Sequence, residues 1–223
     1  MPLVVAFISQ KGGVGKSTLA RGLATLTVAN GSKTKVADLD LQQRTAIVWE
    51  TTRARHGVKP TVNVQAFDTV KDALSAARSS DLLILDIAGK ITDGASEASQ
   101  FAHLLVQPTS PSSDDLHISV LVFLAMERVG VARDKLAFAL CRVLSAAEEK
   151  YARSYLRSFG YTVLDSSIPE HLGYREAMRA GRSITETDQE VLDGPAKTLM
   201  LDLLRSAERN VDKKARPRRS GRT

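Results

Sequence analysis

A stretch rich in glycine and lysine, I-S-Q-K-G-G-V-G-K-S-T-L at positions 8–19, carries the residue types best suited to chemistry. Its glycines allow positive φ and leave no Cβ between the backbone and an anion, so successive N–H groups can point at phosphate oxygens. Lys16 is placed to neutralise those phosphates, and the Ser17 hydroxyl is placed to bind Mg²⁺. The residues of the loop predicted to bind the phosphates are Gly12, Gly13, Val14, Gly15, Lys16, Ser17 and Thr18.

The spacing of this loop differs from two common glycine motifs. The standard phosphate loop, G-x-x-x-x-G-K-[ST], needs glycine where Gln10 stands. The dinucleotide fingerprint G-x-G-x-x-G needs glycine at Thr18. What the loop has in addition is a second lysine, Lys11, at its start.

Three acidic residues follow apolar runs that we predict to be strands. Asp38 and Asp40 follow a run that starts near Lys35, and Asp86 ends the run 81–86. Open parallel sheets bind ligands at the carboxyl ends of their strands, so these carboxylates are expected beside the loop. We predict that Asp38 and Asp86 bind Mg²⁺ and that Asp40 orients the attacking water. Helix capping is the alternative use of Asp38 and Asp40.

The two-lysine loop K-G-G-V-G-K-S-T resembles the deviant Walker A motif of the ParA/MinD family of ATPases. The segment D-L-D-L-Q at 38–42 is similar to the family's D-x-D-P-Q, with Leu41 in place of proline, and P-T-S-P-S-S-D-D-L at 108–116 is similar to P-x-x-P-S-x-x-D. The resemblance implies ATP with Mg²⁺, and a nucleotide-bound dimer in which Lys11 reaches the phosphates of the other protomer. The residues it implies for catalysis are Lys11, Lys16 and Asp40.

Apolar and amphipathic runs alternate along the chain, which is typical of strands and helices in an α/β protein. Together with the resemblance, this pattern predicts a P-loop NTPase-like three-layer sandwich with a mostly parallel central sheet and helices on both faces. We predict a single ATPase domain over residues 1–211 and a basic, disordered tail over residues 212–223. The chain starts directly at its first strand, so the resemblance is to family members without an N-terminal helix-turn-helix domain.

Local signals predict several element boundaries. Residues 51–60 are expected to form a polar connection, residues 161–164 a short strand, and Asp193 the start of the last helix. Asp114 or Asp115 is expected to cap the helix that follows the proline-rich turn.

Composition restricts the class of protein. The 223 residues are 43% hydrophobic, which is enough for one continuous core. The single cysteine, Cys141, excludes an internal disulfide framework and favours a reducing cytoplasm. No apolar stretch approaches the roughly 20 residues that span a bilayer, and the end of the chain is basic without an apolar face. These features predict a cytoplasmic protein and disfavour membrane attachment.

The net charge of +6 is concentrated near the C terminus. A solvated tail and contact with nucleic acid are both compatible with such a charge run. The resemblance adds Arg175, in a segment where some family members contact DNA. The candidate DNA-binding residues are Arg175, Lys213, Lys214, Arg216, Arg218 and Arg219.

The predicted function is that of a small ParA-type ATPase for plasmid or chromosome partition. Its implied partners are a second copy of the chain, non-specific DNA of the nucleoid and a centromere-binding ParB-like protein. The alternatives are a MinD-like or carboxysome-positioning ATPase, and a small-molecule P-loop ligase. The sequence leaves open the cargo, the partner, the hydrolysis rate, whether tail or body binds DNA, and the choice between ATP and GTP.

Overall fold

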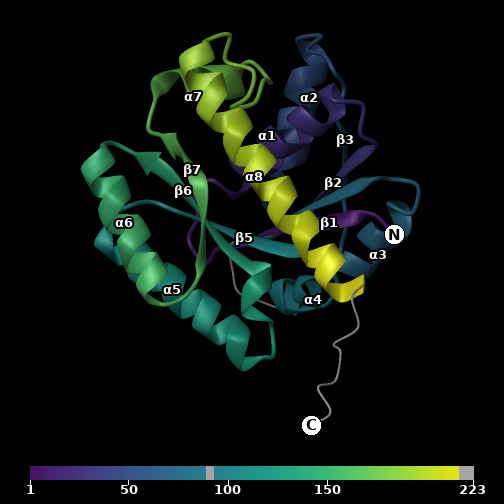
Figure 1. Ribbon diagram of the computed structural model, residues 1–223. Coiled ribbons are helices and arrows are strands. Elements are labelled where there is room, and N and C mark those ends of the chain that lie inside the picture. The colour runs from purple at the N-terminus through teal and green to yellow at the C-terminus, as the bar shows by residue number, and fades with distance from the viewer. Residues whose placement is uncertain (89–92, 216–223) are drawn as a thin grey trace.

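The computed structural model describes residues 1–88 and 93–215, which form seven β-strands, eight α-helices and one 3₁₀ turn (Figure 1). The strands are β1 (Leu3–Phe7), β2 (Thr34–Asp38), β3 (Asn63–Ala66), β4 (Leu82–Asp86), β5 (Leu104–Thr109), β6 (Leu136–Val143) and β7 (Thr162–Pro169). The helices are α1 (Lys16–Ala29), α2 (Thr45–Arg55), α3 (Val70–Ala76), α4 (Asp93–Phe101), α5 (Ser113–Arg128), α6 (Ala146–Ser158), α7 (Leu172–Arg179) and α8 (Glu190–Ala215), with the 3₁₀ turn η1 (Arg133–Lys135) before β6.

The strands form one sheet in the order β3-β2-β4-β1-β5-β6-β7, and every neighbouring pair is parallel. Strands such as β1 (LVVAF) and β4 (LLILD) are apolar on both sides, as a parallel strand between two helix layers requires. The register pairs Asp86 with both Phe7 and Asp38. The segments that follow β1, β2 and β4 therefore leave the sheet side by side at its carboxyl edge.

Helices cover both faces of the sheet, which confirms the predicted three-layer sandwich (Figure 1). One layer contains α1, α2, α7 and α8, and the other contains α3, α4, α5 and α6. The first layer buries Leu19, Trp49, Tyr174 and Leu199 in one cluster. The second layer buries Val70, Ala98, Phe123 and Leu156 in the other cluster.

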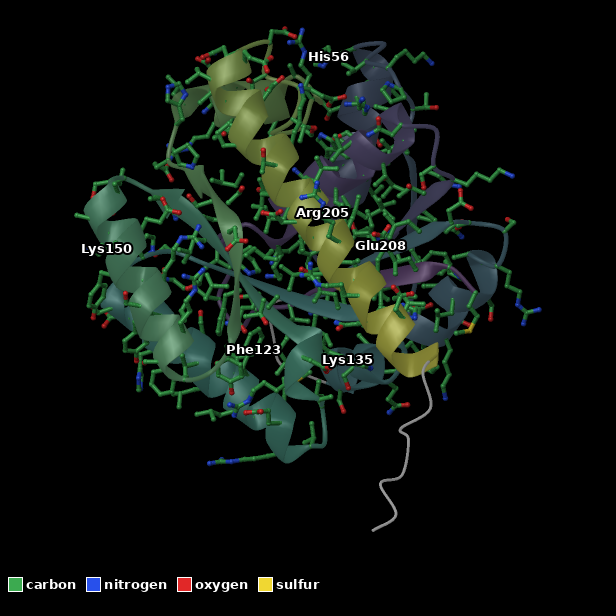
Figure 2. The ribbon with its side chains drawn as sticks, viewed as in Figure 1. His56, Phe123, Lys135, Lys150, Arg205 and Glu208 are labelled. Atoms are coloured by element: carbon green, nitrogen blue, oxygen red, sulfur yellow. The ribbon has the colours of Figure 1, made fainter. Side chains whose placement is uncertain are left out.

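The longest helix, α8, crosses one face of the sheet from the carboxyl edge to the opposite edge (Figure 1). Leu203 and Ala207 are buried on its inner side, whereas Arg205 and Glu208 are exposed on its outer side (Figure 2). Within residues 1–88 and 93–215, none of the helices combines the length and apolar composition that crossing a bilayer requires.

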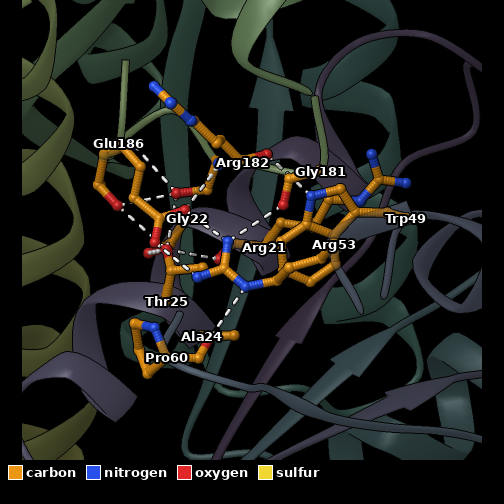
Figure 3. A network of polar contacts seen from close by, with 12 residues as sticks. Arg21, Gly22, Ala24, Thr25, Trp49, Arg53, Pro60, Gly181, Arg182 and Glu186 are labelled. Atoms are coloured by element: carbon orange, nitrogen blue, oxygen red, sulfur yellow. Dashed lines mark hydrogen bonds and ion pairs between the residues drawn. The ribbon is translucent and has the colours of Figure 1, made fainter. Parts of the chain in front are cut away.

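A buried arginine fastens the end of α2 to the segment that follows α7 (Figure 3). Arg53 is only 1% exposed. Its guanidinium makes two 2.7 Å hydrogen bonds to the carboxylate of Glu186 and donates to the carbonyls of Pro60 and Gly181 at 2.9 and 3.1 Å. We call these four residues the Arg53 clamp. The indole of Trp49 lies beneath the same guanidinium, 5.5 Å from it.

Three predicted boundaries were wrong, at the end of α2, at the end of β7 and at the start of α8. The expected connection over 51–60 is helical as far as Arg55, because Trp49 and Arg53, four residues apart, bury the same side of α2. The strand over 161–164 extends to Pro169 as β7, because Ser167 and Ile168 pair with β6.

The last helix also differs from the prediction. It starts at Glu190 instead of Asp193, whose carboxylate lies inside the first turn and accepts the Thr187 N–H at 2.8 Å. Helix α8 continues past position 211 to Ala215, so the first residues of the predicted tail are helical.

Candidate active site

The predicted phosphate-binding loop joins β1 to α1 at the carboxyl edge of the sheet. Gly13 and Gly15 have φ of 76° and 115°, a region that favours glycine. A Cβ on Gly15 would also lie 3.4 Å from Sγ of Cys141. Gly15 directly precedes α1, and no described side chain caps this helix. The first N–H groups of α1 and the positive end of its dipole therefore face the loop.

A cavity of about 280 Å³ lies against this loop and the ends of β2 and β4. We call it the phosphate cavity. It brings together four predicted residues from three segments: Lys16 and Ser17 of α1, Asp40 of the turn after β2, and Asp86 of β4. Predicted loop residues that also line it are Gly12, Gly13, Gly15 and Thr18. The sequence did not indicate Arg21, Gln43 and Thr45, which line it as well. Arg21 follows Ser17 by one helical turn, a spacing that could have indicated it.

The charged groups of the phosphate cavity are strongly influenced by burial. Burial raises the pKa of Asp86 to about 6, although a hydrogen bond from the Ser17 hydroxyl opposes the shift, and the nearby Asp38 carboxylate adds to it. Burial lowers the pKa of Lys16, and the carboxylates of Asp86 and Asp40 oppose this shift. The carboxylates thus help to keep Lys16 charged where phosphates would bind.

The residues present fit a divalent cation beside Ser17 and Asp86. The Oδ2 atom of Asp86 is buried and has no hydrogen-bond partner among the described residues. A buried carboxylate oxygen without a donor is costly unless a cation or a donor satisfies it. Mg²⁺ takes one or two protein oxygens and completes its shell with water and phosphate oxygens. Asp86 and Ser17 could supply those protein oxygens.

Asp38 supports the site from beneath and does not line the phosphate cavity. It is completely buried. Its Oδ1 accepts the N–H of Asp40 at 3.1 Å, and its Oδ2 accepts the N–H groups of Ala46 and Ile47 at 2.9 and 3.3 Å. Asp38 therefore caps α2, the alternative use that the sequence left open. Its predicted contact with Mg²⁺ stays a prediction.

Asp40 begins a tight turn at the rim of the phosphate cavity. Its carboxylate accepts the N–H of Gln43 at 3.0 Å, and its carbonyl accepts the N–H of Arg44 at 2.7 Å. Arg44 has a φ of 47°, which is uncommon for a residue with a side chain. The turn places the Asp40 carboxylate within the same cavity as Lys16, as its predicted role near the reacting phosphate requires.

Lys11 takes a different direction from Lys16. Its ammonium lies 2.5 Å from Oδ1 of Asp115 on α5, and its side chain is 56% exposed. Burial tends to raise the pKa of Asp115, but hydrogen bonds from Lys11 and Ser110 hold it below its usual value. The capping prediction for Asp114 or Asp115 was wrong, because the Ser112 hydroxyl caps α5 by accepting the Asp115 N–H.

A second cavity of about 330 Å³ adjoins the other side of the loop, next to Val14 and Thr18. We call it the side cavity. Arg175, one of the predicted DNA contacts, lines it and pairs with Glu170, which also accepts Nε of Arg142 at 2.9 Å. Arg175 is therefore a neighbour of the phosphate loop, and 55% of its side chain is exposed.

The other candidate DNA contacts lie at the end of the chain. Lys213 and Lys214 belong to the last turn of α8. Arg216, Arg218 and Arg219 lie outside the described residues.

Residues 5–184 match the family described as the CobQ/CobB/MinD/ParA nucleotide binding domain. The chain belongs to this family. The predicted ParA/MinD membership is thus confirmed, and the phosphate cavity lies within the matched residues. A comparison with curated protein sequences found no match.

Several solved structures share the ParA/MinD fold of this chain. A chain of the MinC:MinD cell division protein complex of Aquifex aeolicus is 15% identical, with a TM-score of 0.72 over 91% of this chain and 95% of that one. A putative plasmid partition protein of Borrelia burgdorferi is 15% identical, with a TM-score of 0.71 over 92% and 99%. Apo McdA of Cyanothece is 15% identical, with a TM-score of 0.69 over 91% and 100%. At such identities the likeness establishes the fold.

Proposed function

We propose that the protein is a DNA partition ATPase that holds DNA as an ATP-bound dimer and releases it after hydrolysis. The observation that supports this best is the separation of the two loop lysines. Lys16 lines the phosphate cavity, whereas Lys11 binds Asp115 and lines neither of the two cavities that the described residues form at the loop. Lys11 therefore does not serve the phosphate cavity of its own chain, and it could exchange Asp115 for a nucleotide held by a second copy.

ATP and Mg²⁺ are the proposed substrate and cofactor. Two similar structures are described as complexes with adenine nucleotides: MinD of Pyrococcus horikoshii with Mg-ADP, and the putative Borrelia partition protein with AMPPNP. In this chain the loop N–H groups and Lys16 would hold the phosphates, and the side cavity, which shares Gly13, Gly15 and Thr18 with the phosphate cavity, is the proposed place for the base. Mg²⁺ bound to Ser17 and Asp86 would neutralise charge on the β and γ phosphates.

The proposed reaction is hydrolysis of the terminal phosphate. Asp40 would orient a water whose oxygen attacks the γ phosphorus, while the bond from that phosphorus to the bridging β–γ oxygen breaks. The products are ADP and inorganic phosphate, and Lys16 stabilises the negative charge that develops on the leaving oxygen. The lysine in trans would couple this step to the dimer, and a ParB-like partner is the proposed activator.

Non-specific DNA binding is the proposed output. A chain with a net charge of +6 and a run of lysine and arginine near its C terminus can release counterions from DNA. The proposed contacts are Arg175 and the basic C-terminal residues. Affinity should then fall by about 0.9 log units per log unit of salt for each phosphate neutralised. Binding of this kind would place the protein on the nucleoid.

A mobility-shift experiment tests the proposal. An unrelated DNA duplex is mixed with wild type, Lys11→Ala or Lys150→Ala, without nucleotide and with ADP, ATP or a slowly hydrolysed ATP analogue. Lys150 is an exposed lysine on α6, far in sequence from the loop, and serves as the matched control (Figure 2). We expect wild type and Lys150→Ala to shift DNA only with ATP or the analogue, and Lys11→Ala to fail. Equal binding in every nucleotide state would contradict the proposal.

A further inference from the structure

The hydroxyl group of Thr45 lies beside that of Ser17 in the phosphate cavity. Thr45 is the first residue of α2, and its Oγ1 is 2.9 Å from Oγ of Ser17. The Asp86 carboxylate lines the same cavity, and its Oδ2 lacks a partner among the described residues. Oxygen atoms from α1, α2 and β4 thus meet in one part of the cavity.

The spacing of the two hydroxyl oxygens suits neighbouring ligands of one Mg²⁺. With Mg–O bonds of about 2.0–2.1 Å at right angles, adjacent ligands of an octahedral ion lie about 2.9 Å apart. A hydroxyl oxygen can bind a cation through a lone pair and at the same time donate its proton to another acceptor. We propose that Thr45 is a second hydroxyl ligand of the Mg²⁺ that accompanies ATP, an inference that rests on the proposed function.

The backbone that follows Thr45 is held by side chains before any ligand binds. The Thr45 carbonyl accepts Nη2 of Arg21 at 2.6 Å. The next two N–H groups, of Ala46 and Ile47, are held by Asp38. A ligand held in this way loses little conformational freedom when the ion binds. These contacts give Arg21 and Asp38 a role as positioning residues for Thr45.

Thr45 also connects the metal to the residue that orients water. Asp40 and Thr45 stand at the two ends of one short turn, closed by the hydrogen bond from the Arg44 N–H to the Asp40 carbonyl. A cation held at Thr45 would therefore fix the turn that carries the Asp40 carboxylate. Hydrolysis and Mg²⁺ occupancy would be coupled through the backbone of residues 40–45.

The test measures metal affinity instead of activity. Mn²⁺ is titrated into protein saturated with a slowly hydrolysed ATP analogue, and free Mn²⁺ is counted by electron paramagnetic resonance. The variants are Thr45→Val, which removes the hydroxyl at nearly constant volume, and Thr45→Ser, which keeps it. Thr51→Val is the matched control, because Thr51 is exposed on the same helix and, among the described residues, its hydroxyl bonds only to the Ile47 carbonyl.

We expect Thr45→Val to weaken Mn²⁺ binding by about tenfold or more. Thr45→Ser and Thr51→Val should stay within about twofold of wild type, and affinity for the analogue in EDTA should be unchanged in all variants. Equal Mn²⁺ affinity in Thr45→Val and Thr51→Val would overturn this inference and leave the proposed function standing. An equal loss of analogue affinity with and without metal would overturn it as well, since the hydroxyl would then only shape the loop. If wild type shows no metal-dependent binding of the analogue, both the inference and the proposed function fail.

Discussion

Asp86 is a carboxylate that folding removes almost completely from water, with 2% of the residue exposed. Its folded pKa of about 6 lies above the ordinary value of 3.8. A group whose pKa is raised in the folded state favours folding at low pH, and this contribution is lost as the pH rises through the folded value. Without metal, the ionised Asp86 therefore destabilises the fold above pH 6 and has no such effect below pH 4.

Replacing this carboxylate by an amide should stabilise the metal-free protein. We expect Asp86→Asn to raise the free energy of unfolding at pH 7.5 by up to about 3 kcal/mol, the equivalent of two pKa units. The gain should disappear near pH 4, where Asp86 is protonated. Urea denaturation in EDTA at the two pH values measures this difference, with the exposed Asp68→Asn as control. A variant less stable than wild type at pH 7.5 would contradict the argument.

Single residues of the site differ in how far the sequence predicted them. Lys16, Ser17 and Asp86 could be placed together because motif spacing and parallel-strand topology bring their segments to one edge. The contact between Lys11 and Asp115 could not be predicted, because 104 positions separate them and no local pattern links them. Capping by Ser112 was missed for a local reason: serine and aspartate are about equally good caps, so residue preference could not choose between neighbours.

Among the elements, α2 is the one whose position matters most to the site, and it is held at both ends. Its start is fixed by Asp38 and Arg21, and its end by the Arg53 clamp (Figure 3). At Gly181 the clamp is so close that an added Cβ would lie 2.5 Å from the Arg53 backbone. The helix that presents Thr45 is therefore tied directly to the segment after α7.

Breaking the clamp should destabilise the protein. Arg53→Met would leave the Glu186 carboxylate, 21% exposed, without its charged partner. Removing one member of a buried ion pair costs about 3–5 kcal/mol, and the partial exposure of Glu186 favours the lower end. Urea denaturation followed by circular dichroism would measure the loss. Arg55→Met, at an exposed arginine two positions further on, should change stability by less than about 0.5 kcal/mol. Equal effects of the two substitutions would show that the clamp adds nothing.

The extent of α2 illustrates why element boundaries were harder to predict than element types. The stretch T-T-R-A-R-H-G at 51–57 is polar and looks like a connection. Tertiary contacts override that appearance. The Arg53 guanidinium binds Glu186 and the Gly181 carbonyl, both more than 120 positions away, and the Pro60 carbonyl across the following loop. Long apolar strands such as β4 needed no such information, and the sequence predicted them correctly.

At the scale of the whole molecule, the pair between Lys11 and Asp115 sets a condition on dimer formation. If Lys11 is to reach a nucleotide on a second copy, it must leave Asp115. Because more than half of the Lys11 side chain is exposed, the pair stabilises this contact by no more than about 1 kcal/mol. Each copy would lose this pair on dimer formation, and the free energy lost would oppose the dimer.

Weakening the pair should therefore favour the dimer. We expect Asp115→Asn to tighten the dimer that forms with a slowly hydrolysed ATP analogue by up to about fivefold for each pair broken. Sedimentation velocity over a range of protein concentrations measures the dissociation constant. Asp114→Asn is the control, since Asp114 is the exposed neighbour on the same helix. A dimer weaker than that of the control would mean that the Asp115 carboxylate is itself needed across the interface.

The two ends of the described chain lie close together, on the side of the sheet opposite the phosphate loop. Met1 and Asp212 line one shared cavity, and Asn210 donates to the carbonyls of His103 and Asp134 at that same edge. The 26 residues of α8 correspond to about 39 Å of helix at 1.5 Å per residue. A fluorescent protein or a surface anchor fused ahead of Met1 would thus stand on the side of the sheet opposite the loop. Such a molecule could be immobilised or imaged with its nucleotide edge free to meet another copy.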